Sequence, residues 1–173
     1  MVNVGAKLAF PGELEHRRAW RVAASVVDPE VPAVTIADLG ILRGVDFDID
    51  GRVVAKLTPT YSGCPAVLAI ELAVISALEG AGFTDARIER VLSPAWTSDW
   101  ITDEGREKLR AFGIAPPQRT VGSVRALFDV TEVACPHCGA ADTERVSEFG
   151  STACKALYRC KQCREPFDYF KCI

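Results

Sequence analysis

The sequence lacks the features that mark a membrane protein or an exported protein. Its longest apolar run, around residues 66–78, contains Glu71 and Ser76, so no stretch reaches the length needed to span a bilayer. The amino-terminal residues contain no charged start followed by an apolar signal core. We therefore expect a cytoplasmic protein with no membrane partner.

Signatures of several enzyme classes are also missing. The chain has no GxGxxG dinucleotide-binding fingerprint, and it lacks the pair of Glu-x-x-His motifs with which helical bundles build a di-iron centre. Only two histidines are present, His16 in a predicted helix and His137 between two cysteines, and neither completes a triad with a nucleophile. These absences favour a non-catalytic role, and we predict no catalytic residue.

The sequence also has no excess of positive charge. Its formal net charge at pH 7 is −3, and residues 133–173 contain six basic and five acidic side chains. A module that binds DNA or RNA usually presents a basic face. We therefore expect no nucleic-acid partner.

Cysteines, in contrast, are frequent and regularly spaced near the carboxyl end. Cys135 and Cys138 form one C-x2-C pair, and Cys160 and Cys163 form a second pair after 21 intervening residues. This spacing is typical of a four-thiolate zinc ribbon, in which the segment between the pairs runs out and back as a hairpin. Such a site is closed, so it indicates metal binding rather than catalysis. Zinc is favoured, with rubredoxin-like iron or two disulfides as the alternatives.

Two further cysteines flank the second pair. Cys154 precedes Cys160 by six residues, and Cys172 follows Cys163 by nine. If the second pair forms a turn, Cys154 and Cys172 lie nearly opposite each other, roughly 20 Å from the metal. We interpret them as a possible second thiol pair, reduced in the cytosol, which could also hold a soft metal or a disulfide. The alternative is two unrelated thiols.

The chain length allows one ordinary domain with a small appended module. Pro116 and Pro117 interrupt helix formation, which divides the chain into a first domain (1–115), a linker or bridging strand (116–132) and a zinc ribbon (133–173). The predicted elements are a helix over 13–27, strands over 41–47 and 53–57 joined by an Asp-Gly turn, a helix over 64–78, a strand over 86–92 and a helix over 102–112. The fold class is therefore α+β: a two-layer α-β-β-α-β domain followed by a small β zinc ribbon.

Three groups of residues in the first domain are candidate functional residues. Cys64 lies where a strand and a glycine-containing loop lead into a helix, whose free amide groups favour a thiolate; a packing cysteine is the alternative. Glu30 and Asp38 crowd the preceding loop with Asp28, where aspartates also cap turns. Two tryptophans, at 96 and 100, either cover the core or mark a partner surface.

Residues 28–32 (DPEVP), 38–40 (DLG) and 58–65 (TPTYSGCP) resemble the family of small metal–sulfur cluster assembly factors. Members of that family carry a DPE-x-P signature, a DLG signature and one reactive cysteine at this loop-to-helix junction. The resemblance implies that Cys64 is a transfer thiol for an iron–sulfur cluster or iron. It also implies that Asp38 and Glu30 shape the loop of Cys64.

With the added segment 93–114 and the cysteine-rich tail, the whole chain resembles accessory proteins encoded with the ring-epoxidising phenylacetyl-CoA monooxygenase. The resemblance implies a role in phenylacetate catabolism, with the oxygenase and reductase subunits as partners; we also consider a homodimer. Maturation of an iron–sulfur or di-iron cofactor is the favoured role. A structural subunit that docks through the ribbon and the tryptophan loop is the alternative, and an enzyme using Cys64 as a nucleophile is a third.

Overall fold

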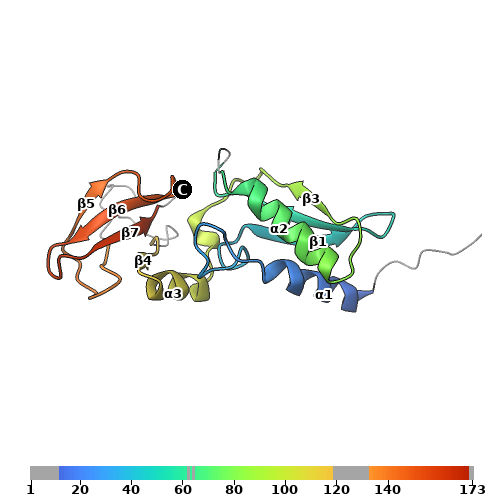
Figure 1. The fold of residues 1–173 in the computed structure, drawn as a ribbon, viewed down its shortest axis with the longest axis horizontal. Helices are drawn as coiled ribbons and strands as arrows, with labels where there is room; N and C mark the ends of the chain where they lie inside the picture. Colours follow the sequence, from blue (N-terminus) through green and yellow to red (C-terminus); the bar gives the residue numbers. More distant parts are fainter. Residues whose placement is uncertain (1–11, 62, 64, 119–132, 172–173) are drawn as a thin grey trace, which may run out of the picture.

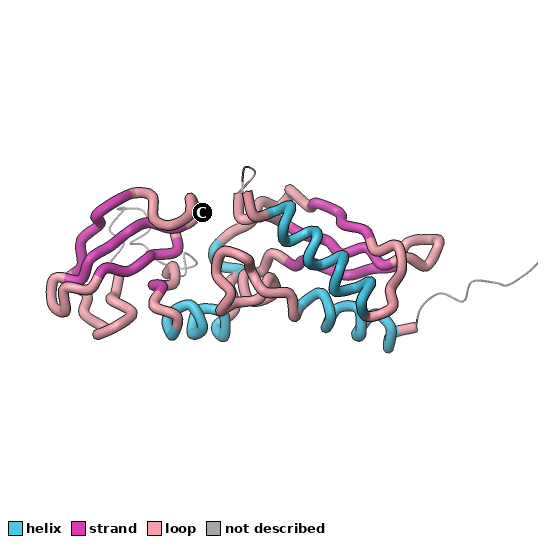
Figure 2. Tube along the Cα trace, viewed as in Figure 1, coloured by secondary structure: helices cyan, strands magenta, loops and turns pink. Residues whose placement is uncertain are grey.

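The computed structural model describes residues 12–61, 63, 65–118 and 133–171. Two small sheets lie side by side along the long axis of the molecule (Figure 1). Three helices accompany them in the described residues, and Figure 2 shows that all three belong to the part of the chain before the second sheet. The predicted α+β class is therefore confirmed.

The first sheet has the strand order β1-β2-β3 and is built from one hairpin and one crossover. β1 (Leu42–Phe47) and β2 (Val53–Leu57) are antiparallel, whereas β3 (Arg87–Arg90) runs parallel to β2. α1 (Glu13–Ala24) contacts β1 and α2, and α2 (Val67–Gly80) also contacts β3, so the two helices form the second layer. This is the predicted α-β-β-α-β order.

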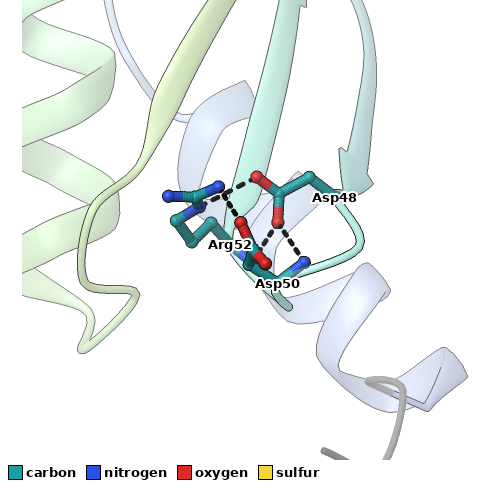
Figure 3. A network of polar contacts seen from close by, with 3 residues as sticks. All are labelled: Asp48, Asp50 and Arg52. Carbon is teal, nitrogen blue, oxygen red and sulfur yellow. Dashed lines mark hydrogen bonds and ion pairs between the residues drawn. The ribbon is translucent and has the colours of Figure 1, made fainter.

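The hairpin turn between β1 and β2 is held by one aspartate. Asp48 Oδ1 accepts hydrogen bonds from the backbone N–H groups of Asp50 and Arg52, both at 2.9 Å, and its Oδ2 pairs with Arg52 Nε at 2.9 Å (Figure 3). Gly51 supplies the positive φ of +78° that the turn requires. The Asp-Gly turn that the sequence predicts is thus present.

The first two helices, α1 and α2, end or begin a few residues away from their predicted limits. α1 stops at Ala24 rather than at residue 27, because Val26 O accepts from Ile36 N at 2.9 Å and Val27 forms a β-bridge with Thr35. α2 starts at Val67 rather than at residue 64, and the chain turns at residues 65 and 66. In the described part of the chain, no helix combines the length and the apolar character needed to cross a membrane.

The two tryptophans cover the core instead of extending from it. Trp96 is 4% exposed, and its indole N–H donates to Leu39 O at 2.8 Å. Trp100 is half-buried beneath the guanidinium of Arg43, whose Cζ lies 3.6 Å from the ring centroid. Of the two roles considered for this loop, its position favours the covering role.

The second sheet has the strand order β4-β7-β6-β5. β5 (Thr143–Ser147), β6 (Lys155–Cys160) and β7 (Pro166–Phe170) form an antiparallel meander, as the ribbon spacing predicts. β4 (Ile114–Ala115) pairs in parallel with β7 and directly follows α3 (Asp103–Ala111), so residues assigned to the first domain join the sheet of the ribbon. The predicted linker or bridging strand (116–132) lies mostly at 119–132, outside the described residues, and its described residues 116–118 are not in a strand.

Gly40 is a position at which no other residue fits. Its φ is +67°, and an added Cβ would lie 2.6 Å from Trp100 Cβ. Gly51 has a similar φ of +78° but open space around it. We expect Gly51→Ala to lower the free energy of unfolding by about 1–2 kcal/mol through backbone strain alone. Gly40→Ala should add a further cost of about 1–3 kcal/mol from the clash. Urea unfolding of both variants measures the difference, and equal losses would contradict the predicted close packing at Gly40.

Candidate metal centre and interdomain pocket

The four cysteines of the two C-x2-C pairs converge on one point. Their sulfur atoms all lie within 4.8 Å of one another. Cys135 Sγ is 3.8 Å from Cys163 Sγ, and Cys138 Sγ is 3.6 Å from Cys160 Sγ. A regular tetrahedron with zinc–sulfur bonds of about 2.3 Å has edges of about 3.8 Å. The sulfur positions therefore fit one tetrahedral metal ion with four thiolate ligands.

The local backbone explains why these sulfurs point inward. In the first turn, Gly139 N donates to Cys135 O at 2.9 Å, and Gly139 has a φ of +78°. In the second, Arg164 N donates to Cys160 O at 3.1 Å, and Cys163 N donates to Cys160 Sγ at 3.4 Å. This amide hydrogen bond lowers the pKa of Cys160 to about 7, while burial and the neighbouring sulfurs of Cys160, Cys138 and Cys135 raise the pKa of Cys163 to about 12. Of these two thiols, Cys160 is therefore the one that ionises first.

A second candidate site is a pocket between the first domain and the ribbon. It encloses a cavity of about 20 Å³, enough for about one water molecule. Residues from the loop after α1, from β2 and from α2 form its first-domain wall, and Cys154 and Phe170 form its ribbon wall. The side chains that line the pocket include those of Asp28, Glu30, Thr60, Val67, Cys154 and Phe170.

The segment that contains Cys64 begins and ends at this pocket. Thr60 and Val67, which both line the pocket, lie four residues before and three residues after Cys64 in the sequence. Cys64 itself lies outside the described residues, so its role as a transfer thiol remains a prediction. The described residues on either side of Cys64, Thr60 and Val67, share the pocket with Asp28, Glu30 and Cys154.

Asp28 and Glu30 both line this pocket. Asp28 Oδ1 accepts hydrogen bonds from Glu30 N and Val31 N, both at 2.8 Å. Burial raises the pKa of Asp28, while these amides and the nearby Lys155 ammonium oppose that rise. Asp28 thus folds the loop, which is the structural role considered for it, and it directs Glu30 toward the pocket.

Asp38, in contrast to Asp28 and Glu30, is not among the described residues that line the pocket. Its Oδ2 accepts from Thr35 N at 2.8 Å and from Lys108 Nζ at 3.0 Å. Burial acts to raise its pKa, but the Thr35 amide and the Lys108 ammonium outweigh burial and hold the pKa of Asp38 below 3.8. Asp38 therefore fastens the loop to α3.

Sequence reasoning missed the contact between Cys154 and Glu30. Cys154 Sγ lies 3.9 Å from Glu30 Oε2, although 124 residues separate them in the chain. Cys154 O also accepts from Lys171 N at 2.9 Å, which places Cys154 beside the residue that precedes Cys172. Cys172 is outside the described residues, so the second thiol pair remains a prediction. The sequence contains no local signal for a contact between residues that are 124 positions apart in the chain.

Comparisons with known proteins match the two parts of the chain separately and the whole chain together. Residues 19–89 match the iron–sulfur cluster assembly protein family, and residues 119–171 match the PaaD zinc beta ribbon domain. The chain is 49% identical over 167 residues to one subunit of the "Putative 1,2-phenylacetyl-CoA epoxidase" of Escherichia coli (strain K12), with 96% of this chain and 99% of that protein covered.

Two more relatives match the first domain. The chain is 39% identical over 75 residues to the "Fe-S protein maturation auxiliary factor YitW" of Bacillus subtilis (strain 168), covering 43% of this chain and 72% of that protein. The fold is also similar to the crystal structure of a DUF59 domain of unknown function from Bacillus anthracis. The TM-score is 0.52 at 24% identity, with 56% of this chain and 92% of that chain covered.

The convergence of four sulfurs predicts the behaviour of serine variants. We expect the wild-type protein to hold one metal ion per chain, and Cys160→Ser to lose it. Because metal binding in such sites contributes roughly 10 kcal/mol or more of folding energy, the ribbon should unfold while the first domain stays folded. Elemental analysis and circular dichroism measure both effects. Cys154→Ser is the matched control and should retain the metal, since six residues of strand, about 20 Å, separate Cys154 from Cys160. Well-folded wild-type protein with neither zinc nor iron would contradict the site.

The hydrogen bonds of Asp38 predict a pH dependence of stability. A carboxyl group whose pKa is lower in the folded state contributes stability above its unfolded pKa and loses it as the pH falls through the folded value. We expect Asp38→Asn to destabilise the protein at pH 7 and to approach wild-type stability below pH 3.8. Asp46→Asn, at an exposed ion pair with Lys56, is the control and should change stability little at either pH. Chemical denaturation at both pH values tests this, and a constant effect of Asp38→Asn would contradict it.

Proposed function

The chain belongs to the PaaD family, which includes a component of 1,2-phenylacetyl-CoA epoxidase, and we propose that it is an accessory protein of this multicomponent oxygenase. In this proposal it assists the maturation of an iron–sulfur or di-iron cofactor through Cys64. The oxygenase and reductase subunits are its partners, and the protein does not itself carry out the 1,2-epoxidation of the ring.

The observation that carries this proposal is that each of the three sequence motifs contributes residues to one pocket. These residues are Asp28, Glu30 and Val31 of the first motif, Leu39 of the second, and Pro59 and Thr60 of the third. α2 begins three residues after Cys64. Asp38 holds the intervening loop on α3. A thiol next to the amino end of a helix is favoured as a thiolate, because the free amide groups there stabilise negative charge. Such a thiolate can bind iron or a cluster and release it to a client.

The ribbon metal has a different task in this proposal. Cys135, Cys138, Cys160 and Cys163 would hold zinc, with iron as the alternative, and the four thiolates fill its coordination sphere. The metal then supplies folding energy to the ribbon. It has no open position for substrate.

A structural subunit is the second candidate, and the ribbon surface provides its support. Val146 and Phe149, at and just beyond β5, are 57% and 64% exposed, so the outer edge of the ribbon could contact an oxygenase component. The tryptophan loop supports docking less well, because Trp96 is buried in the protein's own core.

Reconstitution with purified reductase and oxygenase tests the proposal. We expect the wild-type protein to raise the iron content and the epoxidase activity of incompletely loaded partners. Cys64→Ala should keep the circular dichroism spectrum and lose this effect, so that activity falls to the level measured without the protein. Ser76→Ala, an exposed substitution on α2, is the control and should act like the wild type.

The same experiment separates the two candidate functions. A maturation factor becomes dispensable once its partners are loaded, whereas a structural subunit is required in stoichiometric amount throughout. Full activity with Cys64→Ala would refute the transfer-thiol role and leave Cys64 as a packing residue.

A further inference from the structure

One hairpin connects the four-cysteine centre to the interdomain pocket. β6 runs from Lys155, next to the pocket-lining Cys154, to the metal ligand Cys160. β7 starts three residues after the ligand Cys163 and ends at Phe170, which also lines the pocket. Lys155 and Phe170 are opposite each other in the antiparallel register. The two sites are therefore opposite ends of one pair of strands.

The pocket end of this hairpin is inserted into the core of the first domain. Cys154 and Phe170 are 6% and 2% exposed and belong to the same apolar cluster as the first-domain core. The Phe170 ring packs on Trp96, with 6.2 Å between centroids, and Trp96 in turn donates to Leu39 O. The end of the hairpin thus closes the pocket as an apolar plug.

A buried cation lies at the same end of the hairpin. Lys155 is 4% exposed, and its Nζ lies 3.8 Å from Asp168 Oδ2 of β7. A buried ammonium group is stable only near compensating negative charge. The ion pair therefore ties β6 to β7 at the end that meets the first domain.

The metal end of the hairpin has little apolar support of its own. In the described residues, the core cluster of the ribbon contains seven buried side chains, and two of them are the ligands Cys135 and Cys160. A core of this size contributes little stability without a crosslink or a metal. The order of β6 and β7 therefore depends on the four-cysteine centre.

We infer that the ribbon is a metal-dependent cap, in which occupancy of the four-cysteine centre controls access to the interdomain pocket. With the metal bound, the hairpin keeps Cys154, Lys155 and Phe170 in place and the pocket stays closed at this end. When the metal is lost, the hairpin loosens, the plug withdraws and the pocket opens beside the segment that contains Cys64. The functional meaning of this opening rests on the proposed transfer role, whereas the opening itself does not require Cys64.

Hydrogen exchange of the full-length protein, read by mass spectrometry, tests the coupling. The zinc-loaded protein is compared with protein from which a chelator has removed the zinc under reducing conditions, and with Cys138→Ser. We expect exchange at residues 28–41 and 94–101, and alkylation of Cys154 by iodoacetamide, to rise at least about tenfold. Peptides from β2 and the middle of α2 should not change, which shows that the first domain remains folded.

Two substitutions at the pocket end of the hairpin distinguish the effect of losing the apolar plug from the effect of losing the metal. Phe170→Ala and Lys155→Met should produce the same rise in exchange at residues 94–101 while the full metal content is retained. Lys161→Met changes a half-exposed lysine at the metal end of the same hairpin and is the matched control, with no rise expected.

Two outcomes would overturn the inference. One is unchanged exchange and alkylation after complete removal of the metal. The other is a rise that includes β2 and α2, because the whole first domain would then unfold. The measurement is repeated in Cys64→Ala, where the same coupling is expected. If the exchange experiment refutes the cap, the transfer-thiol proposal is unaffected. If reconstitution refutes the transfer role of Cys64, the cap is unaffected.

Discussion

The burial of the loop between α1 and β1 is the constraint on which the rest of the structure depends. This loop is apolar, with Val31, Val34, Ile36 and Leu39 almost fully buried, so its backbone polar groups must find partners inside the protein. Asp28 accepts from two of its amides, and the loop forms its own bonds between Asp28 N and Val34 O and between Ile36 N and Val26 O. The carboxylates of Asp28 and Asp38 therefore stabilise the fold of the loop, whether or not they also contribute to a functional site.

Two later parts of the chain, α3 and the tryptophan loop, are attached directly to this loop, and the ribbon is attached through the tryptophan loop. Thr102, the residue that caps α3, donates its backbone N–H to Asp38 O at 2.9 Å, and Lys108 of α3 pairs with the Asp38 carboxylate. A Cβ added to Gly105 would lie 2.8 Å from Asp38 O, so α3 approaches the loop as closely as a glycine allows. The tryptophan loop binds Leu39 O, and the ribbon packs on that tryptophan. The position of the ribbon over the pocket is thus set by a loop more than one hundred residues earlier.

The sequence predicted the parts of this arrangement that depend on local pattern. β2 has its predicted limits, and the cysteine spacing placed four sulfurs on one tetrahedron, because period, turn chemistry and ligand spacing are local properties. The amino end of α1 at residue 13 was predicted correctly, but its carboxyl end was not, because bonds of residues 26 and 27 to the later loop outweigh helix propensity. The pairing of β4 with β7 and the contact of Cys154 with Glu30 join distant segments, so no spacing rule could reveal them. The role of Asp38 in shaping the loop of Cys64 remains a prediction; in the structure its carboxylate pairs with Lys108 of α3.

If Cys64 transfers iron or a cluster as proposed, the separation of the two sites allows one protein to hold two metals with opposite requirements. Four thiolates in a closed tetrahedron bind zinc tightly and exchange it slowly, as a site that contributes folding energy must. A transfer thiol has to release its cargo, and therefore needs few ligands and an accessible position. About six residues of strand, roughly 20 Å, lie between Cys160 and Cys154, so no ligand can be shared between the centre and the pocket. The strands β6 and β7 run from the centre to the pocket, and this connection can transmit order from one end to the other without any exchange of metal.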